Sequence, residues 1–229
     1  MASVTAAWTT IGQWRGLKHY SALKWAYRSP ALFLSTVSEH QIASTEILRL
    51  DEGLCGQDIA VELSAGAHEL FYLCSHGETT SDRYRAVLDG SDWDLDTMGG
   101  GAQVVVCDTC DLVDLSSGAW EAGLLAQLAG ARTQLLLGFA SKATISRSTS
   151  ERGRLFAEYI ARGDAVAEAW IDAVHDVTPR AGLDSDRPIA IALGDTRAEA
   201  SEVLGLSWPE LLVNGRSGAQ TFIEYLGGA

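Results

Sequence analysis

Basic residues are scarce in this chain of 229 residues. Lysine occurs three times, and 17 Lys and Arg stand against 30 Asp and Glu, which gives a formal net charge of −13. Binding to a nucleic-acid backbone or to an anionic membrane surface needs clustered cations. The sequence also lacks any apolar run of the roughly 18 residues that a membrane-spanning helix needs. We therefore expect neither a nucleic acid nor a membrane as a partner.

Cysteine and proline are rare as well, with four of each. Four thiols in a chain of this length do not make a disulfide scaffold, which points to a reducing compartment. The first 20 residues contain Thr9, Thr10, Gln13 and Arg15 and lack the continuous apolar core of a secretory signal. The sequence thus predicts a cytoplasmic protein.

The chain has no internal repeat, no low-complexity tract and no linker rich in proline or serine. Because 47% of its residues are hydrophobic, it can bury one sizeable core, and we expect a single domain over residues 1–229 with its core at 65–195. Residues 1–60 form an N-terminal segment that could belong to the sheet, act as a partner-binding arm or be removed. Within it, the spacing of apolar residues predicts a helix over 17–28 and a short strand over 31–37.

Apolar runs of strand length alternate with amphipathic helical patterns from residue 68 onward. The runs predict buried strands at Glu69–Cys74, Gln103–Cys107, Gln134–Phe139 and Pro188–Leu193. The helical period predicts helices at Ser117–Ala129, Ser150–Arg162, Asp164–Val174 and Arg197–Leu204. Between the first two strands, Arg83–Leu95 has the pattern of a hairpin about Asp89-Gly90. This alternation predicts an α/β fold with a mainly parallel central sheet.

Chemically reactive side chains directly follow two of the predicted strands. One leads into Cys74-Ser75-His76-Gly77-Glu78 and the other into Cys107-Asp108-Thr109-Cys110-Asp111. In open α/β sheets, functional sites form at the carboxyl ends of the strands. His76 and Cys110 could meet there, with the thiolate attacking a carbonyl and the imidazole moving the proton. Gly77 would allow close backbone approach, and its N–H could bind an oxyanion.

The same two segments resemble motifs of a known family. Phe71-Tyr72-Leu73-Cys74-Ser75-His76-Gly77 looks like the strand–His–Gly segment of caspase-like (clan CD) cysteine peptidases. Val105-Val106-Cys107-Asp108-Thr109-Cys110 resembles the strand and Asp-Ala-Cys motif that carries their nucleophile. The resemblance implies His76 as the catalytic base and acid, Cys110 as the nucleophile, and Asp108 as a supporting residue. The order of the two residues and their separation of 34 positions (110 − 76) agree with that clan.

A second block is similar to bacterial caspase-like, gingipain-like and CHAT-domain proteins. It consists of Leu136–Phe139, Gly153–Tyr159, Gly163 and Ala169-Trp170. The resemblance implies a caspase-like three-layer sandwich that hydrolyses a peptide bond through a thioester acyl-enzyme, without a cofactor. It also implies a peptide or protein substrate and allows a regulatory protein partner. Two features depart from the family pattern, since Cys110 has no glycine close after it and Thr109 replaces the commoner alanine.

In caspase-like folds, the loop after the strand that follows the nucleophile helps to build the primary substrate pocket. Here that loop runs from Phe139 through Ser141 and Lys142 to Ala143. Acidic residues near the strand ends favour a basic side chain before the scissile bond, namely Glu78, Asp82, Asp111 and Asp114. Lys142 favours an acidic one instead. We expect Glu78, Asp111, Phe139, Ser141 and Lys142 to contact the substrate, with a basic preference.

A zinc-dependent nucleoside or base deaminase is an alternative. His76-Gly77-Glu78 is H-x-E, and after 28 intervening residues (106 − 78) Cys107-Asp108-Thr109-Cys110 is C-x-x-C. Such enzymes hold zinc with one His and two Cys while the Glu shuttles protons. Against this, Val106 stands where the signature has proline, and the residues after Glu78 do not continue a helix.

A catalytically inactive caspase-like module that binds partners is the other alternative. Cys74 and Cys107 fall inside apolar runs and are expected to pack as small buried side chains. Asp108 is expected to hydrogen-bond loop amides beneath the nucleophile. Such a module would keep this fold without the chemistry of His76 and Cys110.

Overall fold

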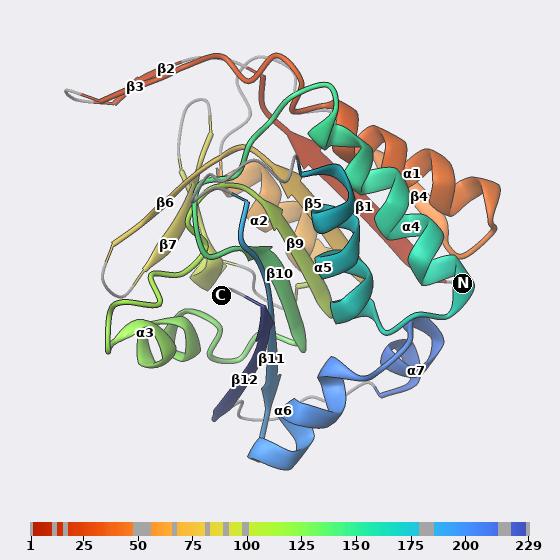
Figure 1. The fold of residues 1–229 in the computed structure, drawn as a ribbon. Helices are drawn as coiled ribbons and strands as arrows, with labels where there is room; N and C mark the ends of the chain where they lie inside the picture. The colour runs from red at the N-terminus through yellow and green to blue at the C-terminus, as the bar shows by residue number, and fades with distance from the viewer. Residues whose placement is uncertain are drawn as a thin grey trace.

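A seven-stranded sheet forms the centre of the molecule, in the order β12-β11-β10-β9-β5-β1-β4 (Figure 1). The computed structural model describes residues 2–10, 13–15, 18–47, 56–65, 68–80, 83–88, 92–97, 101–178, 186–214 and 221–227. The strands of this sheet are β1 (Ser3–Trp8), β4 (Ser44–Ile47), β5 (Leu70–Cys74), β9 (Val104–Asp108), β10 (Leu135–Phe139), β11 (Pro188–Gly194) and β12 (Phe222–Gly227). Neighbours from β4 to β10 pair in parallel, and β11 and β12 join antiparallel. The mainly parallel sheet expected from the sequence is confirmed.

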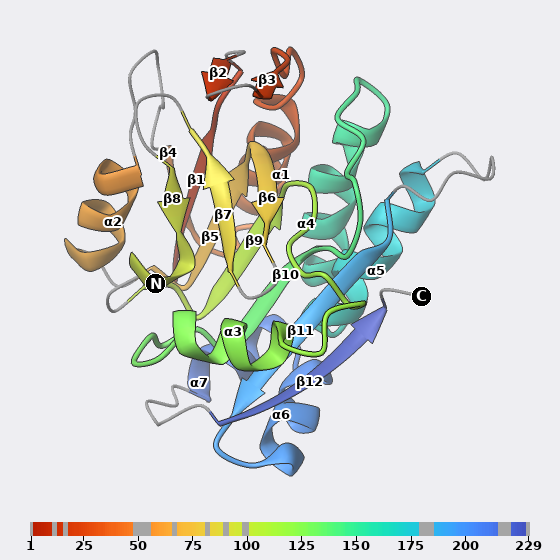
Figure 2. The same cartoon turned by 90° about the vertical axis from the view of Figure 1, so that its left-hand side faces the viewer.

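Both faces of the sheet are covered, which is why strands such as β5 and β10 are continuous apolar runs rather than alternating ones. One face packs against α1 (Arg28–Glu39), α4 (Arg152–Arg162) and α5 (Val166–Val177). The other packs against α2 (Gly56–Ala65), α3 (Trp120–Gln127) and a small sheet of β6 (His76–Thr79), β7 (Tyr84–Val87) and β8 (Trp93–Asp94). Figure 2 shows this second face, with β6, β7 and α3 in front of the central strands. The arrangement is a three-layer sandwich, as expected.

The remaining elements lie at the margins of these layers. α6 (Arg197–Leu204) packs on β11 and β12, and α7 (Trp208–Val213) follows it. Two short 3-10 turns are η1 (Leu95–Thr97) and η2 (Thr149–Glu151), and β2 (Gln13–Arg15) and β3 (Lys18–Tyr20) form a separate antiparallel pair. In the described part of the chain, no helix combines the length and the apolar character needed to cross a membrane.

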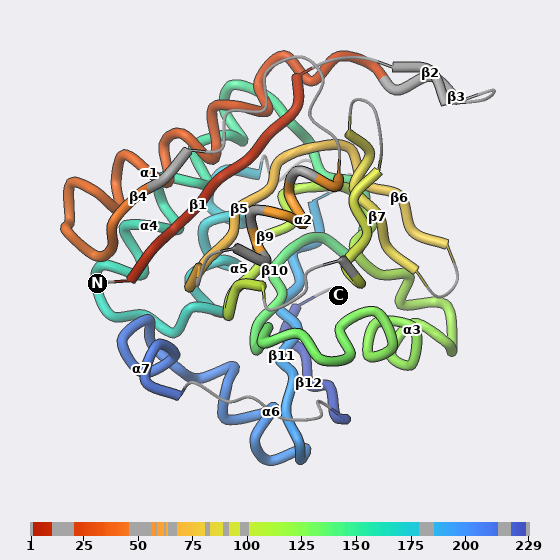
Figure 3. The backbone as a smooth tube through the Cα atoms, turned by 180° about the vertical axis from the view of Figure 1, so that it is seen from behind, coloured from red at the N-terminus to blue at the C-terminus, as the bar shows by residue number. Residues whose placement is uncertain are grey.

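The first 60 residues contribute directly to the sheet, as far as the structure describes them. β1 lies between β5 and β4, and the tube view of Figure 3 shows it running alongside β5. The predicted strand over 31–37 is wrong, because these residues lie inside α1, with Phe33, Leu34 and Val37 on its buried face. A short apolar run cannot distinguish a strand from a buried helix segment. The predicted helix over 17–28 is wrong as well, since it contains β3 and a turn.

The other predicted elements are confirmed with shifted ends. α3 begins at Trp120, three residues after the expected start, and η2 precedes α4. α4 ends at Arg162 and is capped by Gly163, whose φ of 91° is the left-handed conformation of a helix C-cap. β7 and β8 form the expected antiparallel hairpin, although Asp89-Gly90 lies outside the described residues. The extra strand β6 was not expected, because its sequence HGET has no apolar run.

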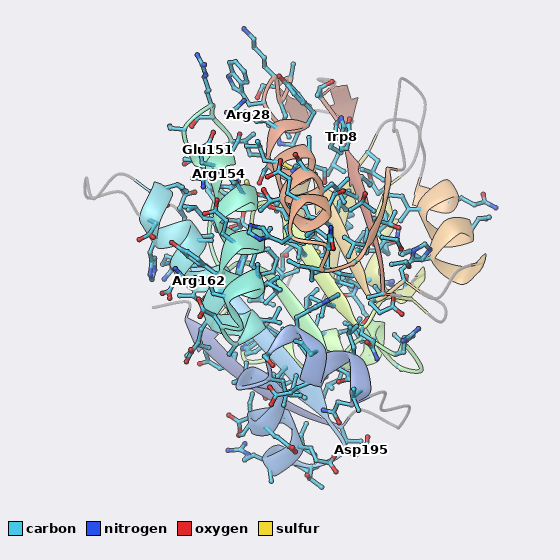
Figure 4. All side chains as sticks on the ribbon, turned by 90° about the vertical axis from the view of Figure 1, so that its right-hand side faces the viewer. Trp8, Arg28, Glu151, Arg154, Arg162 and Asp195 are labelled. Atoms are coloured by element: carbon cyan, nitrogen blue, oxygen red, sulfur yellow. The ribbon has the colours of Figure 1, made fainter. Side chains whose placement is uncertain are left out.

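Helices α1 and α4 begin side by side, and this contact places the start of α4 near the strand ends. Figure 4 shows Arg28 of α1 beside Glu151 and Arg154, and Glu151 forms ion pairs with both arginines. Such partly exposed pairs contribute little, typically up to about 1 kcal/mol. Apolar packing contributes more, since the rings of Phe33 and Phe156 stack 5.3 Å apart. α4 therefore starts at a fixed place above the sheet, beginning with Arg152.

Candidate active site at the ends of β5 and β9

The ends of β5 and β9 lie side by side because Cys74 pairs with Asp108 in the parallel ladder. His76 and Cys110 each follow these paired residues by two positions. At Gly77, the place that a Cβ would occupy lies less than 3.0 Å from the carbonyl oxygen of Cys110 and 2.9 Å from the Thr109 hydroxyl oxygen. Only glycine allows the two backbones to approach so closely. The two residues singled out in the sequence therefore lie on backbone segments that touch each other.

His76 is the first residue of β6 and is half-buried. Its Nε2 lies 2.7 Å from the carbonyl oxygen of Ser21, which directly follows β3. A carbonyl oxygen can only accept a hydrogen bond, so this contact requires Nε2 to carry the proton. The neutral imidazole then has its basic lone pair on Nδ1. No pattern in the sequence indicates this contact, because the partner is a backbone atom 55 positions away.

Cys110 is half-buried, and its Sγ accepts a hydrogen bond of 3.3 Å from the backbone N–H of Ala143. Burial raises the pKa of this thiol, and the hydrogen bond from Ala143 opposes that rise. The carboxylates of Asp111, Asp108 and Asp186 raise the pKa further. The resting Cys110 is therefore a thiol at neutral pH rather than a preformed thiolate.

The chain turns sharply directly after this thiol, and again at Asp186, whose charge acts on it. Asp111 has a φ of 49° and Asp186 a φ of 62°, and both values lie in the left-handed region that favours glycine. Asp tolerates this conformation better than most residues, because its short polar side chain can hydrogen-bond locally. The turn after Cys110 is thus made without the glycine that the sequence lacks at this point.

Asp108 was expected to hydrogen-bond loop amides. Among the described residues, its carboxylate instead forms a two-point ion pair with Arg152, through Nε at 3.0 Å and through Nη2. The Tyr72 hydroxyl donates a third hydrogen bond of 3.0 Å and is itself joined to the Ser29 hydroxyl at 2.8 Å. Both charged side chains are almost completely buried, with exposures of 1% for Arg152 and 0% for Asp108. A substrate cation therefore cannot reach Asp108.

Sequence reasoning missed Arg152, although a signal was present. Arg152, Phe156, Tyr159 and Ile160 follow one another at helical spacing, which places the arginine on the apolar face of α4. A charged side chain on such a face needs a buried partner. That partner is Asp108, 44 positions earlier in the chain.

An open pocket of about 1220 Å³ lies next to Cys110. Of the expected substrate contacts, Asp111, Ser141 and Lys142 line it, and Arg187 adds a cation that sequence reasoning missed. Phe139 was expected to contact the substrate, but its ring is fully buried between Trp170 and the Arg152 guanidinium. Its strand position at the end of β10 turns it inward.

The structure does not support the expected substrate contact of Glu78 either. It does not line the pocket, and its carboxylate pairs with Arg85 at 2.8 Å. Asp82 lies outside the described residues. Among the described residues, the charged side chains that line the pocket are two carboxylates and two cations, namely Asp111, Asp114, Lys142 and Arg187.

The three proposed zinc ligands, His76, Cys107 and Cys110, and the proposed proton shuttle Glu78 do not form a metal site. Cys107 lies inside β9 with its side chain fully buried, and burial raises the pKa of its thiol to about 12. Glu78 is engaged by Arg85 instead. Within the ranges that the structure describes, no three His, Cys, Asp or Glu side chains gather closely enough to hold one metal ion. The deaminase alternative therefore lacks its ligand set. Cys74 and Cys107 are buried core residues, as expected.

The fold and this site define a three-layer α/β domain with a histidine and a cysteine at adjoining strand ends. Residues 64–196, more than half of the chain, match the family described as "Domain of unknown function (DUF6345)". The chain belongs to this family. No curated protein matches the sequence.

Solved structures to which the chain is similar include two caspases. The Drosophila initiator caspase Dronc has 12% identity and a TM-score of 0.48, over 79% of this chain and 75% of that chain. Caspase-1 from Spodoptera frugiperda has 12% identity and a TM-score of 0.46, over 79% of each chain. Likeness at this level carries no argument about activity. The similarity to gingipain-like and CHAT-domain proteins and a bacterial source stay predictions, as does a cytoplasmic location.

Proposed function

We propose that this chain is a cysteine peptidase that uses Cys110 as its nucleophile and His76 as its general base and acid. The observation that carries the proposal is the contact between Gly77 and the carbonyl of Cys110, with the pocket opening beside the thiol. A histidine and a cysteine on touching backbone segments, next to a pocket, are the parts that nucleophilic catalysis needs. Their order in the chain and the resemblance of both motifs to caspase-like peptidases support the same proposal.

The first half of the reaction forms a thioester. The basic Nδ1 of His76 takes the proton of the Cys110 thiol as the sulfur attacks the carbonyl carbon of the scissile bond. Backbone N–H groups of Gly77 and Cys110 are proposed to bind the oxyanion of the tetrahedral intermediate. The C–N bond then breaks, and the amine leaves with the proton carried by His76.

The second half releases the acyl group. His76 takes a proton from a water molecule, whose oxygen attacks the thioester carbon. The C–S bond then breaks, and His76 returns its proton to the sulfur. The products are the free thiol of Cys110, which restores the resting state, and a carboxylic acid that releases its proton to solvent. Because the raised pKa keeps Cys110 protonated at neutral pH, catalysis requires His76 in the first step.

The substrate is proposed to be a peptide or protein segment whose side chain enters the pocket beside Cys110. Asp111 and Asp114 attract a basic side chain, and Lys142 and Arg187 attract an acidic one. Burial raises the pKa of Asp111, while Lys142 and Arg187 oppose the rise. These two cations therefore already balance part of the negative charge of Asp111. The basic preference stays a prediction, and a regulatory protein partner remains part of the proposal without a defined surface.

The test is labelling by thiol-reactive peptide probes, one with lysine and one with aspartate before the reactive group. Wild-type protein should be labelled at Cys110, and Cys110→Ala should lose labelling while keeping its fold by circular dichroism. Cys107→Ala is the matched control, because it removes a nearby but fully buried thiol and should still be labelled.

Two outcomes would refute the proposal. Equal labelling of Cys110→Ala and wild type would show that another residue is the nucleophile. A folded wild-type chain that neither probe labels, and that cleaves no peptide in a mixed library, would instead indicate an inactive binding module.

A further inference from the structure

The buried ion pair of Arg152 and Asp108 also reaches the loop beside the proposed nucleophile. Arg152 uses Nε and Nη2 to hold Asp108, and its Nη1 donates a hydrogen bond of 3.0 Å to the carbonyl oxygen of Thr144. Asp108 precedes Cys110 by two positions, and Thr144 follows Ala143 directly. One planar guanidinium thus joins the strand that carries the thiol to the loop that donates an N–H to its sulfur.

The loop around Ala143 is held on both sides of that residue. The N–H of Asp186 donates to the carbonyl of Lys142 at 2.8 Å, and the Asp186 carboxylate accepts from the N–H of Thr144. The carbonyl of Thr144 accepts from Arg152 and also from the Thr149 hydroxyl at 2.7 Å. Ala143 lies between these anchored residues, so its N–H points at the Cys110 sulfur in a fixed direction.

We propose that Arg152 is a positioning residue for Cys110, which sets the hydrogen bond between the Ala143 N–H and the thiolate that forms during the reaction. The inference rests on the proposed function insofar as Cys110 is the reacting thiol. Arg152 itself does not touch the pocket, because it is almost completely buried and does not line it. It acts through Asp108 on one side and through Thr144 on the other.

A lysine at position 152 cannot contact Asp108 and Thr144 at the same time. The guanidinium presents its donors in a rigid fork that matches a carboxylate and still leaves Nη1 for a carbonyl, whereas an ammonium is a compact point charge. Arg152→Lys therefore keeps the positive charge beside Asp108 but loses the simultaneous hold on Thr144. The Ala143 N–H then moves relative to the sulfur, and the thiolate loses a donor.

The experiment measures the pH dependence of alkylation of Cys110 by iodoacetamide in the full chain. Tandem mass spectrometry distinguishes Cys110 from the other cysteines. Charged groups near the thiol are Asp108, Asp111 and Asp186. Asp114, Lys142 and Arg187 line the adjoining pocket, and His76 lies on the adjoining strand. Arg152→Lys changes none of them. Losing one hydrogen bond to a thiolate is expected to raise the midpoint of the profile by about one pH unit. The limiting rate at high pH should stay within about twofold of wild type.

Arg154→Lys is the matched control. Arg154 lies on the same helix, is 38% exposed and pairs only with the surface residues Glu151 and Glu158 among the contacts described. The midpoint of the alkylation profile of Arg154→Lys should equal that of wild type. Arg152→Met is a second variant that also removes the charge, and its midpoint should rise by at least as much as that of Arg152→Lys if it folds.

A folded Arg152→Lys with the wild-type midpoint would overturn the inference, and so would an unfolded Arg152→Lys, because the guanidinium would then serve the fold alone. Alkylation breaks no peptide bond, so the shift can be measured even if the chain proves to have no peptidase activity. Failure of the peptide probes and failure of the pH shift are therefore separate results.

Discussion

The backbone of Gly77 lies so close to the carbonyl oxygen of Cys110 that no Cβ fits between them. We expect Gly77→Ala to push β6 away from residues 109–111 and to lower probe labelling of Cys110 at least tenfold. Forcing a methyl group into a packed site typically costs about 1–3 kcal/mol, so the free energy of unfolding should fall by that order. Labelling rates and urea unfolding would measure both effects.

Gly118→Ala is the control for this substitution. A Cβ at position 118 has no atom within 4 Å, so the variant should label and unfold like wild type. Wild-type labelling of a folded Gly77→Ala would mean that the close approach of the two strand ends is irrelevant to the thiol's reactivity.

The strand ends were predictable because β5, β9 and β10 are buried on both faces and therefore show as unbroken apolar runs. Placing His76 and Cys110 at those ends needed only the rule that parallel strands end at one edge. The α1 segment was misjudged because 31–37 is apolar and short, and its helical face becomes visible only over the longer span Arg28–Glu39.

The contacts that complete the site could not be predicted from the sequence, for a different reason. The groups that hold His76 and Cys110 are the Ser21 carbonyl and the Ala143 N–H, and every residue carries such backbone atoms. Phe139 was misassigned because sequence order places it at the start of the loop, whereas the pleat of β10 turns its ring into the core. Arg152 was the exception, since its helical spacing marked it as a buried charge.

Removing the imidazole should separate peptide hydrolysis from simple thiol reactivity. We expect His76→Gln to lower kcat/KM for peptide hydrolysis by about 10²–10⁴, the usual contribution of a general acid–base. Alkylation of Cys110 at high pH should persist, because a thiolate formed by hydroxide needs no histidine. His40→Gln is the control, as His40 is exposed and lies at the end of α1. Equal losses of activity in both variants would remove His76 from the mechanism.

The buried thiol of Cys107 should make the protein lose stability in alkali. An unfolded thiol ionises near pH 8.5, whereas the folded state holds this proton up to a pKa of about 12. Between these values the unfolded state binds fewer protons, so the free energy of unfolding falls as pH rises, by about 1.4 kcal/mol per pH unit for one proton.

Urea unfolding of wild type and Cys107→Ala between pH 8 and 11 would measure this slope. The variant starts less stable because it leaves a small cavity, but its stability should decline less steeply with pH. Parallel declines in the two proteins would show that Cys107 does not contribute to the loss. The comparison uses slopes, so the constant cost of the cavity does not enter it.

The four charges that line the pocket should tune substrate choice in opposite directions. The measured quantity is the ratio of kcat/KM for two peptides that differ only in lysine or glutamate before the scissile bond. Water screens charges at the mouth of a pocket, so each of them is expected to change this ratio by a few-fold at most. Lys142→Ala should therefore raise the ratio by up to about fivefold in favour of lysine, and Asp114→Asn should lower it. Arg162→Ala, on the exposed end of α4, should leave it unchanged. Unchanged ratios in both pocket variants would mean that this side chain binds elsewhere.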